Sequence, residues 1–400
     1  MVCHWSAGIP ARPERVTSMA VALGSTTLAV LPVFLLGALA VFVRRDLGFS
    51  LTVLGAAASA FYGTSALASI HGGRLAQRWG PERSLAVGAV GSALTLLGVA
   101  ALATGWRSLV ACLAVGGCAN ALSQPAANSL VARDQRPDRH GTSFGVLQTG
   151  IPLSTLLAGL AVPSVGAELG WRWAFVLGAS GAVPILWFAL RRQGGGGRSR
   201  RPAGREVVTG LPMAPLYVLA AAAGLAAAPS NAMGAFYVES AVSNGHPVGS
   251  AGLWLMIGSL CGILGRVLWG WGADRWQGDP LRTMAVLLLI GAAGFVLLGL
   301  SAGMQYLALG TVFAFGAGWA WKGLFNLAIV QRYPGWASAA LGITQAGVFA
   351  GSVLGPLGFG LVLAHSSYAA AWTASAICLA VAPLLIAVHS RMVRRLERAD

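Results

Sequence analysis

The 400-residue chain contains few charged residues: they make up 10% of it, whereas hydrophobic residues make up 56%. Soluble domains carry about 25% charged residues, so this composition, with a mean hydropathy of +0.70, indicates an integral membrane protein. A net charge of +15 suggests nucleic acid binding in a soluble protein, but here the arginines fall in short gaps between apolar runs. We therefore expect a lipid bilayer as the surrounding partner and no nucleic acid.

The sequence also lacks the patterns that enzymes and pumps require. There is no HExxH motif, no cluster of acids and no phosphate-binding loop, which argues against a membrane enzyme and against a self-contained ATP-driven pump. The 5 cysteines are scattered, without a CxxC pair or a metal spacing with histidine. We therefore expect no disulfide framework, no metal and no cofactor.

Long apolar runs are what the chain has in abundance. A membrane-spanning helix needs about 20 apolar residues, and the runs are too long and too aliphatic for barrel strands. The first run is also too long for a signal peptide. The fold class expected is an all-α integral membrane protein with twelve transmembrane helices. Their predicted limits are 19–43, 51–72, 84–104, 107–131, 143–165, 173–190, 211–237, 250–270, 283–302, 306–330, 337–364 and 370–390.

The arginines predict how the chain lies in the membrane. Most of them would lie on one side, and only Arg44, Arg45, Arg107 and Arg172 on the other, so both termini are expected in the cytoplasm, beneath the cell inner (plasma) membrane. A Gly/Arg-rich stretch predicts a flexible cytoplasmic linker. The predicted domains are a tail at 1–18, a six-helix bundle at 19–190, the linker at 191–210, a second six-helix bundle at 211–390 and a tail at 391–400.

The two predicted bundles repeat each other in sequence. The segment GRLAQRW at 73–79 aligns with GWGADRW at 270–276, and GVLQTG at 145–150 aligns with GITQAG at 342–347. Both matches have the same offset, 197 residues, between positions 73 and 270 and between 145 and 342. Duplicated six-helix halves with a site at their interface are a transporter architecture.

The repeated loop carries a resemblance to a known family. Its second copy keeps Gly270, Asp274 and Arg275 of a G-x-x-x-D-R/K-x-G-R/K signature; the first keeps Gly73, Arg78, Gly80 and Arg83 but has Gln77 in place of the usual aspartate. The chain therefore resembles a major facilitator superfamily transporter across essentially its whole length. The resemblance implies two pseudo-symmetric bundles, alternating access through a central cavity and a monomer. In the first copy, Gln77 puts a charge relay in doubt.

Two further stretches resemble a subgroup of that family. The segments 144–152 (FGVLQTGIP) and 318–326 (GWAWKGLFN) are similar to bacterial cyanate-permease and nitroimidazole-transporter-like proteins. This similarity implies a small organic or anionic solute as substrate. The glycine-rich segment 351–360 (GSVLGPLGFG) resembles the family's exporter motif, but its small-residue spacing predicts close helix packing instead.

Lys322, the only lysine, is the main candidate for contact with the substrate. A charge near the middle of a membrane helix costs roughly 2.5–3.5 kcal/mol, so it usually faces a cavity. On a continuous helix Trp319 and Asn326 share the face of Lys322, and Gln124 and Asn128 are the repeat-related positions of the fourth span. We expect Lys322 to bind an anion in a pocket shaped by these amides. The alternative is that Lys322 snorkels to the cytoplasmic interface.

Three more amides are candidates for the pathway. Gln148 and Gln345 occupy equivalent places in the two halves, where they either face the pathway or hold helices together. Asn231 follows Pro229 and predicts a broken or kinked seventh span. A separate set of residues is expected to gate the conformational change rather than bind substrate: Asp274, Arg275, Gly270, Gly73, Arg78 and Arg266.

The 12 acids fall outside the predicted spans or close to their ends, and Glu239 comes nearest to the interior. A proton-coupled carrier commonly has an acid in its core, so we expect uniport, anion exchange or coupling through the anion itself. Two other functions are open. Trp254, Trp269, Trp319 and Trp321 favour an exporter of drugs or antibiotics, and a non-transporting membrane sensor is less favoured because the tails are short.

Overall fold

A computed structural model describes residues 12–135, 140–192, 212–275, 278–300, 303–333 and 336–396, and every regular element within these ranges is a helix. The segments 193–211 and 397–400 lie outside them, with most of the predicted linker, so the division into domains stays a prediction. The helices are α1 (Arg12–Ala38), α2 (Ala40–Leu47), α3 (Leu51–Trp79), α4 (Pro81–Leu102), α5 (Trp106–Asp134), α6 (His140–Gln148), α7 (Gly150–Ala161), the π-helical turn η2 (Val162–Gly166), α8 (Trp171–Ala179), α9 (Ala182–Arg192), α10 (Met213–Ser243), α11 (Val248–Arg275), α12 (Pro280–Gly299), α13 (Met304–Gly316), α14 (Lys322–Arg332), α15 (Ala337–His365) and α16 (Tyr368–Leu396).

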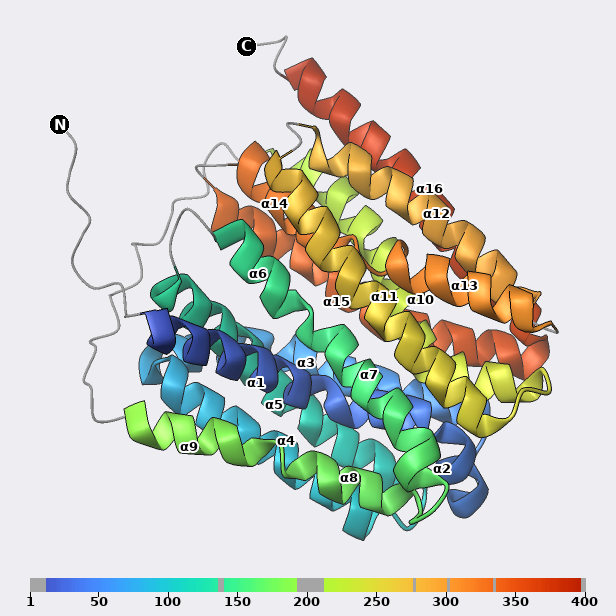
Figure 1. Cartoon of the computed structure of the whole chain (residues 1–400). Coiled ribbons are helices and arrows are strands. Elements are labelled where there is room, and N and C mark those ends of the chain that lie inside the picture. The colour runs from blue at the N-terminus through green and yellow to red at the C-terminus, as the bar shows by residue number, and fades with distance from the viewer. Residues whose placement is uncertain are drawn as a thin grey trace.

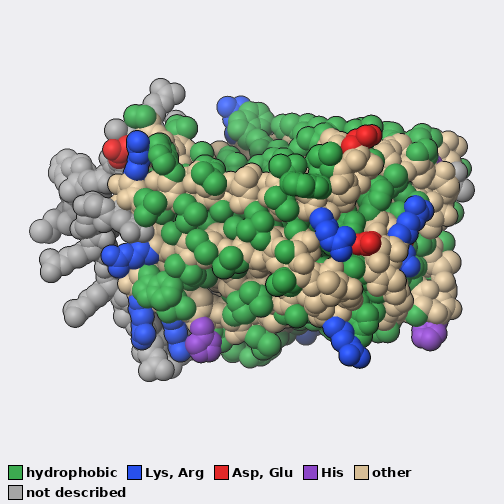
Figure 2. All heavy atoms as spheres, turned by 90° about the horizontal axis from the view of Figure 1, so that it is seen from below, with side chains coloured by type: hydrophobic (Ala, Val, Ile, Leu, Met, Phe, Trp, Pro, Cys, Tyr) green, Lys and Arg blue, Asp and Glu red, His purple; other side chains and the backbone are tan. Residues whose placement is uncertain are grey.

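These helices are long and apolar enough for a membrane protein. Within the described residues, 11 helical stretches could cross a bilayer by length and composition, and the shorter apolar helix α13 adds part of one more crossing. Figure 2 shows green and tan side chains over the middle of the molecule, with charged side chains toward its two ends. Such a surface suits the hydrocarbon core of a bilayer. The predicted all-α fold is confirmed.

The two halves of the chain lie side by side (Figure 1). Helices α1 to α9 form one group, and α10 to α16 form the other. The start of α1 and the end of α16 lie at the same end of the helix bundle, which we call the terminal end. We call the opposite end, which holds α2 and the start of α3, the far end.

The tenth predicted span, 306–330, is not one helix, which corrects the sequence prediction. Helix α13 ends at Gly316, five residues form a turn, and α14 begins at Lys322. The backbone N–H of Gly318 reaches back to Phe313 O (3.1 Å), and that of Ala320 bonds Ala317 O (3.2 Å). These bonds replace the regular i to i−4 ladder, so the crossing is interrupted in its middle.

Glycines let helices approach closely within the second half. On α15, Gly347, Gly351 and Gly355 lie directly on the backbone of α10, where a Cβ added to Gly351 would collide with the carbonyl of Gly224. This contact confirms the packing interpretation of the 351–360 segment.

In the first half, the buried carboxylate of Asp134 accepts hydrogen bonds from Ser18 Oγ (2.5 Å) and Arg192 Nη1 (2.6 Å), and so joins α1, α5 and α9.

The two halves touch closely at the far end. Between α3 and α15, Ser59 Oγ donates to Val353 O (2.6 Å), and a Cβ on Gly55 would collide with the carbonyl of Pro356. Between α7 and α11, a Cβ on Gly159 would lie 2.8 Å from Gly252 O. Nearer the terminal end, by contrast, Gly145 on α6 has open space beside it. The structure therefore has its halves closed together at the far end.

Candidate functional site

Lys322 is the first residue of α14 and lies at the break in the tenth crossing. Its side chain is half-buried and, within the described part of the chain, forms no hydrogen bond or ion pair. The first helical bond of α14 runs from Phe325 N–H to Trp321 O (3.0 Å). The N–H groups just before Phe325 therefore have no main-chain acceptor among the described residues and stand at a helix N-terminus, where the helix dipole is positive. Lys322 adds a full charge to this positive end.

Arg266 on α11 lies beside the same break and is 5% exposed. Its Nε and Nη2 donate to Trp319 O at 3.2 and 3.1 Å, and its Nη1 donates to Gln148 O. The carbonyl of Gln148 is available because Pro152, four residues later, has no N–H to donate to it. Arg266 thus binds main-chain oxygens that two interrupted helices expose, one in each half of the molecule.

Neither cation has an acidic partner in the described residues. The carboxylates that form ion pairs there are engaged elsewhere: Glu239 with Arg44, Asp46 with Arg172, Asp279 with Arg332, Glu82 with Arg133, Glu14 with Arg192, and Asp134 with both Arg133 and Arg192. Arg266 also acts electrostatically on Lys322. The centre of the molecule therefore holds two neighbouring positive charges that no described acid balances, and a negatively charged ligand would supply what is missing.

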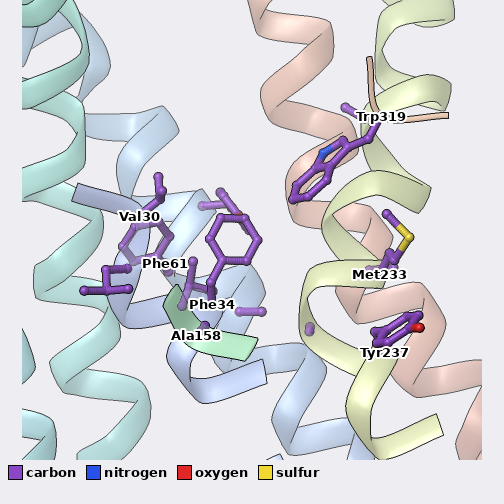
Figure 3. Packing of buried hydrophobic residues seen from close by; sticks show 14 of the residues in the cluster. Val30, Phe34, Phe61, Ala158, Met233, Tyr237 and Trp319 are labelled. Atoms are coloured by element: carbon purple, nitrogen blue, oxygen red, sulfur yellow. The ribbon is translucent and has the colours of Figure 1, made fainter. Parts of the chain in front are cut away.

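Trp319 belongs to this centre, but not on the helical face that the sequence predicts. It lies in the turn before α14, and its indole is 4% exposed. The ring contacts Phe315 and Phe34 edge-on, with centroids 5.3 and 5.9 Å away, and the Arg266 guanidinium lies 5.4 Å from it. Phe34 comes from the opposite half of the molecule (Figure 3). Trp319 therefore packs between the halves and offers its carbonyl rather than its ring to the polar site.

The sequence singles out Trp321, the neighbour of Lys322, only as one of four tryptophans that favour an exporter, and not as a hydrogen-bond donor. The indole Nε1 of Trp321 is buried and has no hydrogen-bond partner in the described residues. Trp321 is 2% exposed and packs edge-on against Phe325 (5.6 Å between centroids). Its position directly before the lysine was the available signal, because the indole N–H of a tryptophan can donate a hydrogen bond.

Four predicted pathway amides share one property: each is half-buried and makes no hydrogen bond to the described residues. They are Gln124 and Asn128 on α5, Asn326 on α14 and Gln345 on α15. Their nitrogens and oxygens need partners in a membrane, because lipid supplies none. No hydrogen bond among the described residues joins Gln124 or Asn128 on α5 to Lys322 on α14.

The remaining two predicted amides differ. Gln148 is 8% exposed, and its Oε1 has no partner in the described part of the chain, next to the carbonyl that Arg266 binds. Asn231 Nδ2 donates to Ala227 O (2.9 Å) and to Ser352 Oγ (3.0 Å), so it joins α10 to α15. Helix α10 runs unbroken through Pro229, so of the two predicted alternatives, a broken or a kinked seventh span, the structure rules out the broken one.

The predicted gating residues lie at the terminal end, with one exception. Gly73 and Gly270 have open space beside them, Arg78 is exposed, and Arg275 lies over the Trp271 ring (4.2 Å). The side chain of Asp274 is outside the described part. Arg266 is the exception: it lies nine residues before Arg275, or about 13 Å along a helix, and each of its three guanidinium nitrogens donates to a central carbonyl. A gating role for the loop stays a prediction.

Comparison with known proteins identifies the family. The chain matches the model of the Major Facilitator Superfamily over residues 21–356 and belongs to that family. A chloramphenicol resistance protein of Streptomyces lividans is 27% identical over 381 residues, 90% of this chain and 92% of that protein. The solved structure of a mutant of the nucleoside transporter NupG superposes with a TM-score of 0.74 at 16% identity, over 94% of this chain and 99% of that one, which shows the shared fold.

Two further relatives match over shorter stretches. A probable actinorhodin transporter of Streptomyces coelicolor is 30% identical over 45% of this chain and 32% of its own length. A probable chloroplastic anion transporter 3 of Arabidopsis thaliana is 30% identical over 37% of this chain and 29% of its own. The matched part spans about a third of the length of each of these two relatives. The chain is a multi-pass membrane protein of the Major Facilitator Superfamily, a family of transporters.

Proposed function

We propose that the protein carries a small anion across the cell inner membrane, with Lys322 as its charged ligand. The observation that supports this most directly is the pair of central cations, Lys322 and Arg266, without an acidic partner in the described residues. A small anion between them would receive charge-assisted hydrogen bonds, which are about twice as strong as neutral ones. The free N–H groups at the start of α14 favour the same charge.

The helices around the site support a transport mechanism in which the two bundles move relative to each other. Discontinuous helices at mid-membrane are typical of transporter sites, and here interrupted crossings of both halves meet at Arg266. We propose alternating access by rocking of two six-helix bundles, 19–190 and 211–390, joined by a cytoplasmic linker at 191–210. The loop residues Gly73, Arg78, Asp274 and Arg275 would then stabilise one of the two states.

Two similarities support the anion over other solutes. One is the sequence resemblance of 144–152 and 318–326 to cyanate-permease and nitroimidazole-transporter-like proteins. The other is the relative named as an anion transporter. The half-buried amides of Gln124, Asn128, Asn326 and Gln345 would line the path that the anion takes, since they are polar and unpartnered in the described residues.

Thermal stabilisation of the purified protein tests this proposal. A ligand present at 100 times its Kd stabilises the folded state by about 2.7 kcal/mol, so binding raises the melting temperature. We expect formate, acetate or nitrate to stabilise the wild type and to lose this effect in Lys322→Ala. Arg282→Ala is the matched control, because it removes an exposed cation at the start of α12. Equal stabilisation of both variants would disprove a role for Lys322.

A second candidate is an exporter of an apolar antibiotic. The aromatic cluster of Tyr237, Phe315 and Trp319, which Phe34 contacts from the other half, favours it, as does the relative named for chloramphenicol resistance. In the same assay chloramphenicol would then stabilise wild type and Lys322→Ala alike, and Trp319→Ala would remove the effect. That pattern would replace the anion proposal.

A further inference from the structure

A single ion pair joins the two halves in the described part of the chain. Arg44 on α2 donates through Nη1 to Glu239 Oε1 on α10, and its Nε donates to Phe49 O (3.2 Å). The other ion pairs among the described residues each stay within one half. The Arg44–Glu239 pair lies at the far end, where backbone contacts close the halves together. It is the part of this closure that a charged ligand can change.

A pocket of about 210 Å³ lies beside this pair. Its polar walls are Arg44, Arg45, Glu239 and Ser243, with Val41 and Val242 as apolar walls. This volume is enough for a solute of a few atoms and lies below the roughly 300–1,000 Å³ of pockets that bury drug-sized ligands. The pocket is therefore suited to a ligand of a few atoms.

The charges of the pocket do not balance. Two arginines face one glutamate, and Arg45 is exposed with no ion pair to any described residue. Glu239 is 9% exposed, and its second oxygen, Oε2, is buried without a hydrogen-bond partner in the described part. Glu239 thus holds Arg44 through one oxygen only, while an unpaired arginine stands next to it. An arriving carboxylate could bind both guanidinium groups at once.

We propose that this far-end pocket recognises small anions, and that an anion bound to Arg44 and Arg45 displaces Glu239 and so releases the closure between α2 and α10. The proposal rests on the proposed function in assuming an anionic substrate. A ligand shifts an equilibrium only by its different affinity for the two states. Here the difference is explicit, because Arg44 is engaged by Glu239 in the closed state and free to bind the anion when the halves part.

A cysteine reporter in the far-end contact tests this idea. Ser59 lies in the α3–α15 contact and is 7% exposed, so a Ser59→Cys thiol reacts with a water-soluble maleimide only when the halves separate. The background replaces the native cysteines by serine. Ser366→Cys is the matched control reporter, because it is exposed in the far-end loop in either state. Formate is the probe, and formamide, a neutral molecule of nearly the same size, is its control at the same concentration.

Formate should raise the labelling rate of Ser59→Cys at least fivefold, the lower end of usual coupling between two sites, and leave Ser366→Cys unchanged. Glu239→Gln should label quickly without formate. Arg45→Gln keeps the ion pair, so it should label slowly and respond little to formate. The double variant Arg44→Glu/Glu239→Arg should label slowly again, because it restores a pair of opposite charges. Melting curves and gel filtration establish beforehand that each variant is folded.

The outcomes separate this inference from the proposed function. If Glu239→Gln labels as slowly as the wild type, the ion pair does not hold the far end closed and the proposal fails. If formate stabilises the protein through Lys322 but does not change labelling, the far-end pocket is not a recognition site, whereas the central anion site stands. If formate changes labelling but anions give no stabilisation that depends on Lys322, the far-end site stands and the central site fails.

Discussion

Arg266 donates a hydrogen bond to the main-chain oxygen of Gln148 across the boundary between the two halves. This oxygen is free because Pro152 cannot donate to it, and the same guanidinium also binds Trp319 O in the second half (3.1 and 3.2 Å). One side chain therefore ties two interrupted crossings together. Under the proposed rocking of the two bundles this tie would break or rearrange, so it is the place where we expect binding and movement to be coupled.

Pro152→Ala should weaken this tie. Alanine supplies the missing N–H, which competes with Arg266 for Gln148 O and continues α6 into α7. One helical bond is gained and one charge-assisted bond is lost, so stability should change by no more than about 1–2 kcal/mol. Transport of the anion in proteoliposomes should fall severalfold. Pro383→Ala on α16 is the control, because it also supplies a missing N–H, here opposite the carbonyl of Leu379. If both variants transport like the wild type, the exposed carbonyl of Gln148 has no role in transport.

Arg266→Lys and Arg266→Gln should separate charge from geometry. Lysine keeps the positive charge, but its ammonium cannot bind two separated carbonyls as the planar guanidinium does. We expect Arg266→Lys to retain anion stabilisation and to lose most transport. Arg266→Gln should lose both, with anion affinity at least tenfold weaker, which is about 1.4 kcal/mol. Anion affinity in Arg266→Gln equal to that of the wild type would mean that Lys322 alone holds the charge.

Much of the fold was predictable because hydrophobic runs and repeats report it directly. Apolar length gave the number of crossings, and the match of GVLQTG with GITQAG gave two related halves. Lys322 could be singled out as a candidate because a lone charge in an apolar run is costly, and its role in a site stays a prediction. In these cases a single physical effect, such as apolar length or the cost of a charge in the membrane, can be read from a short stretch of sequence.

The break before α14 was not predictable, because distant contacts cause it. The turn from Ala317 to Trp321 contains no proline, and its only weak signal is Gly318. A Cβ on Gly291 of α12 would collide with the backbone of Gly318, and one on Gly265 of α11 with the carbonyl of Gly316. Two neighbouring helices therefore press on the segment from outside. Arg266 was assigned to gating for the same reason: its acceptors exist only once both breaks have formed.

Far-end closure should depend on Gly55, which is a test independent of charge. A Cβ at Gly55 on α3 would collide with the carbonyl of Pro356 on α15 and lie 3.4 Å from the Phe236 ring. Gly55→Ala must therefore push the halves apart there, at a cost of about 1–3 kcal/mol to the closed state. The Ser59→Cys reporter should then label at least fivefold faster without any anion.

Gly63→Ala on the same helix is the matched control for that variant. Its Cβ would meet only a Val353 methyl at 3.9 Å, an ordinary contact, so labelling should stay at the wild-type rate. Both substitutions raise helix propensity equally, which leaves the contact across the halves as the difference between them. If Gly63→Ala accelerated labelling as much as Gly55→Ala, the effect would come from α3 itself, and the α3–α15 contact would not be what closes the far end.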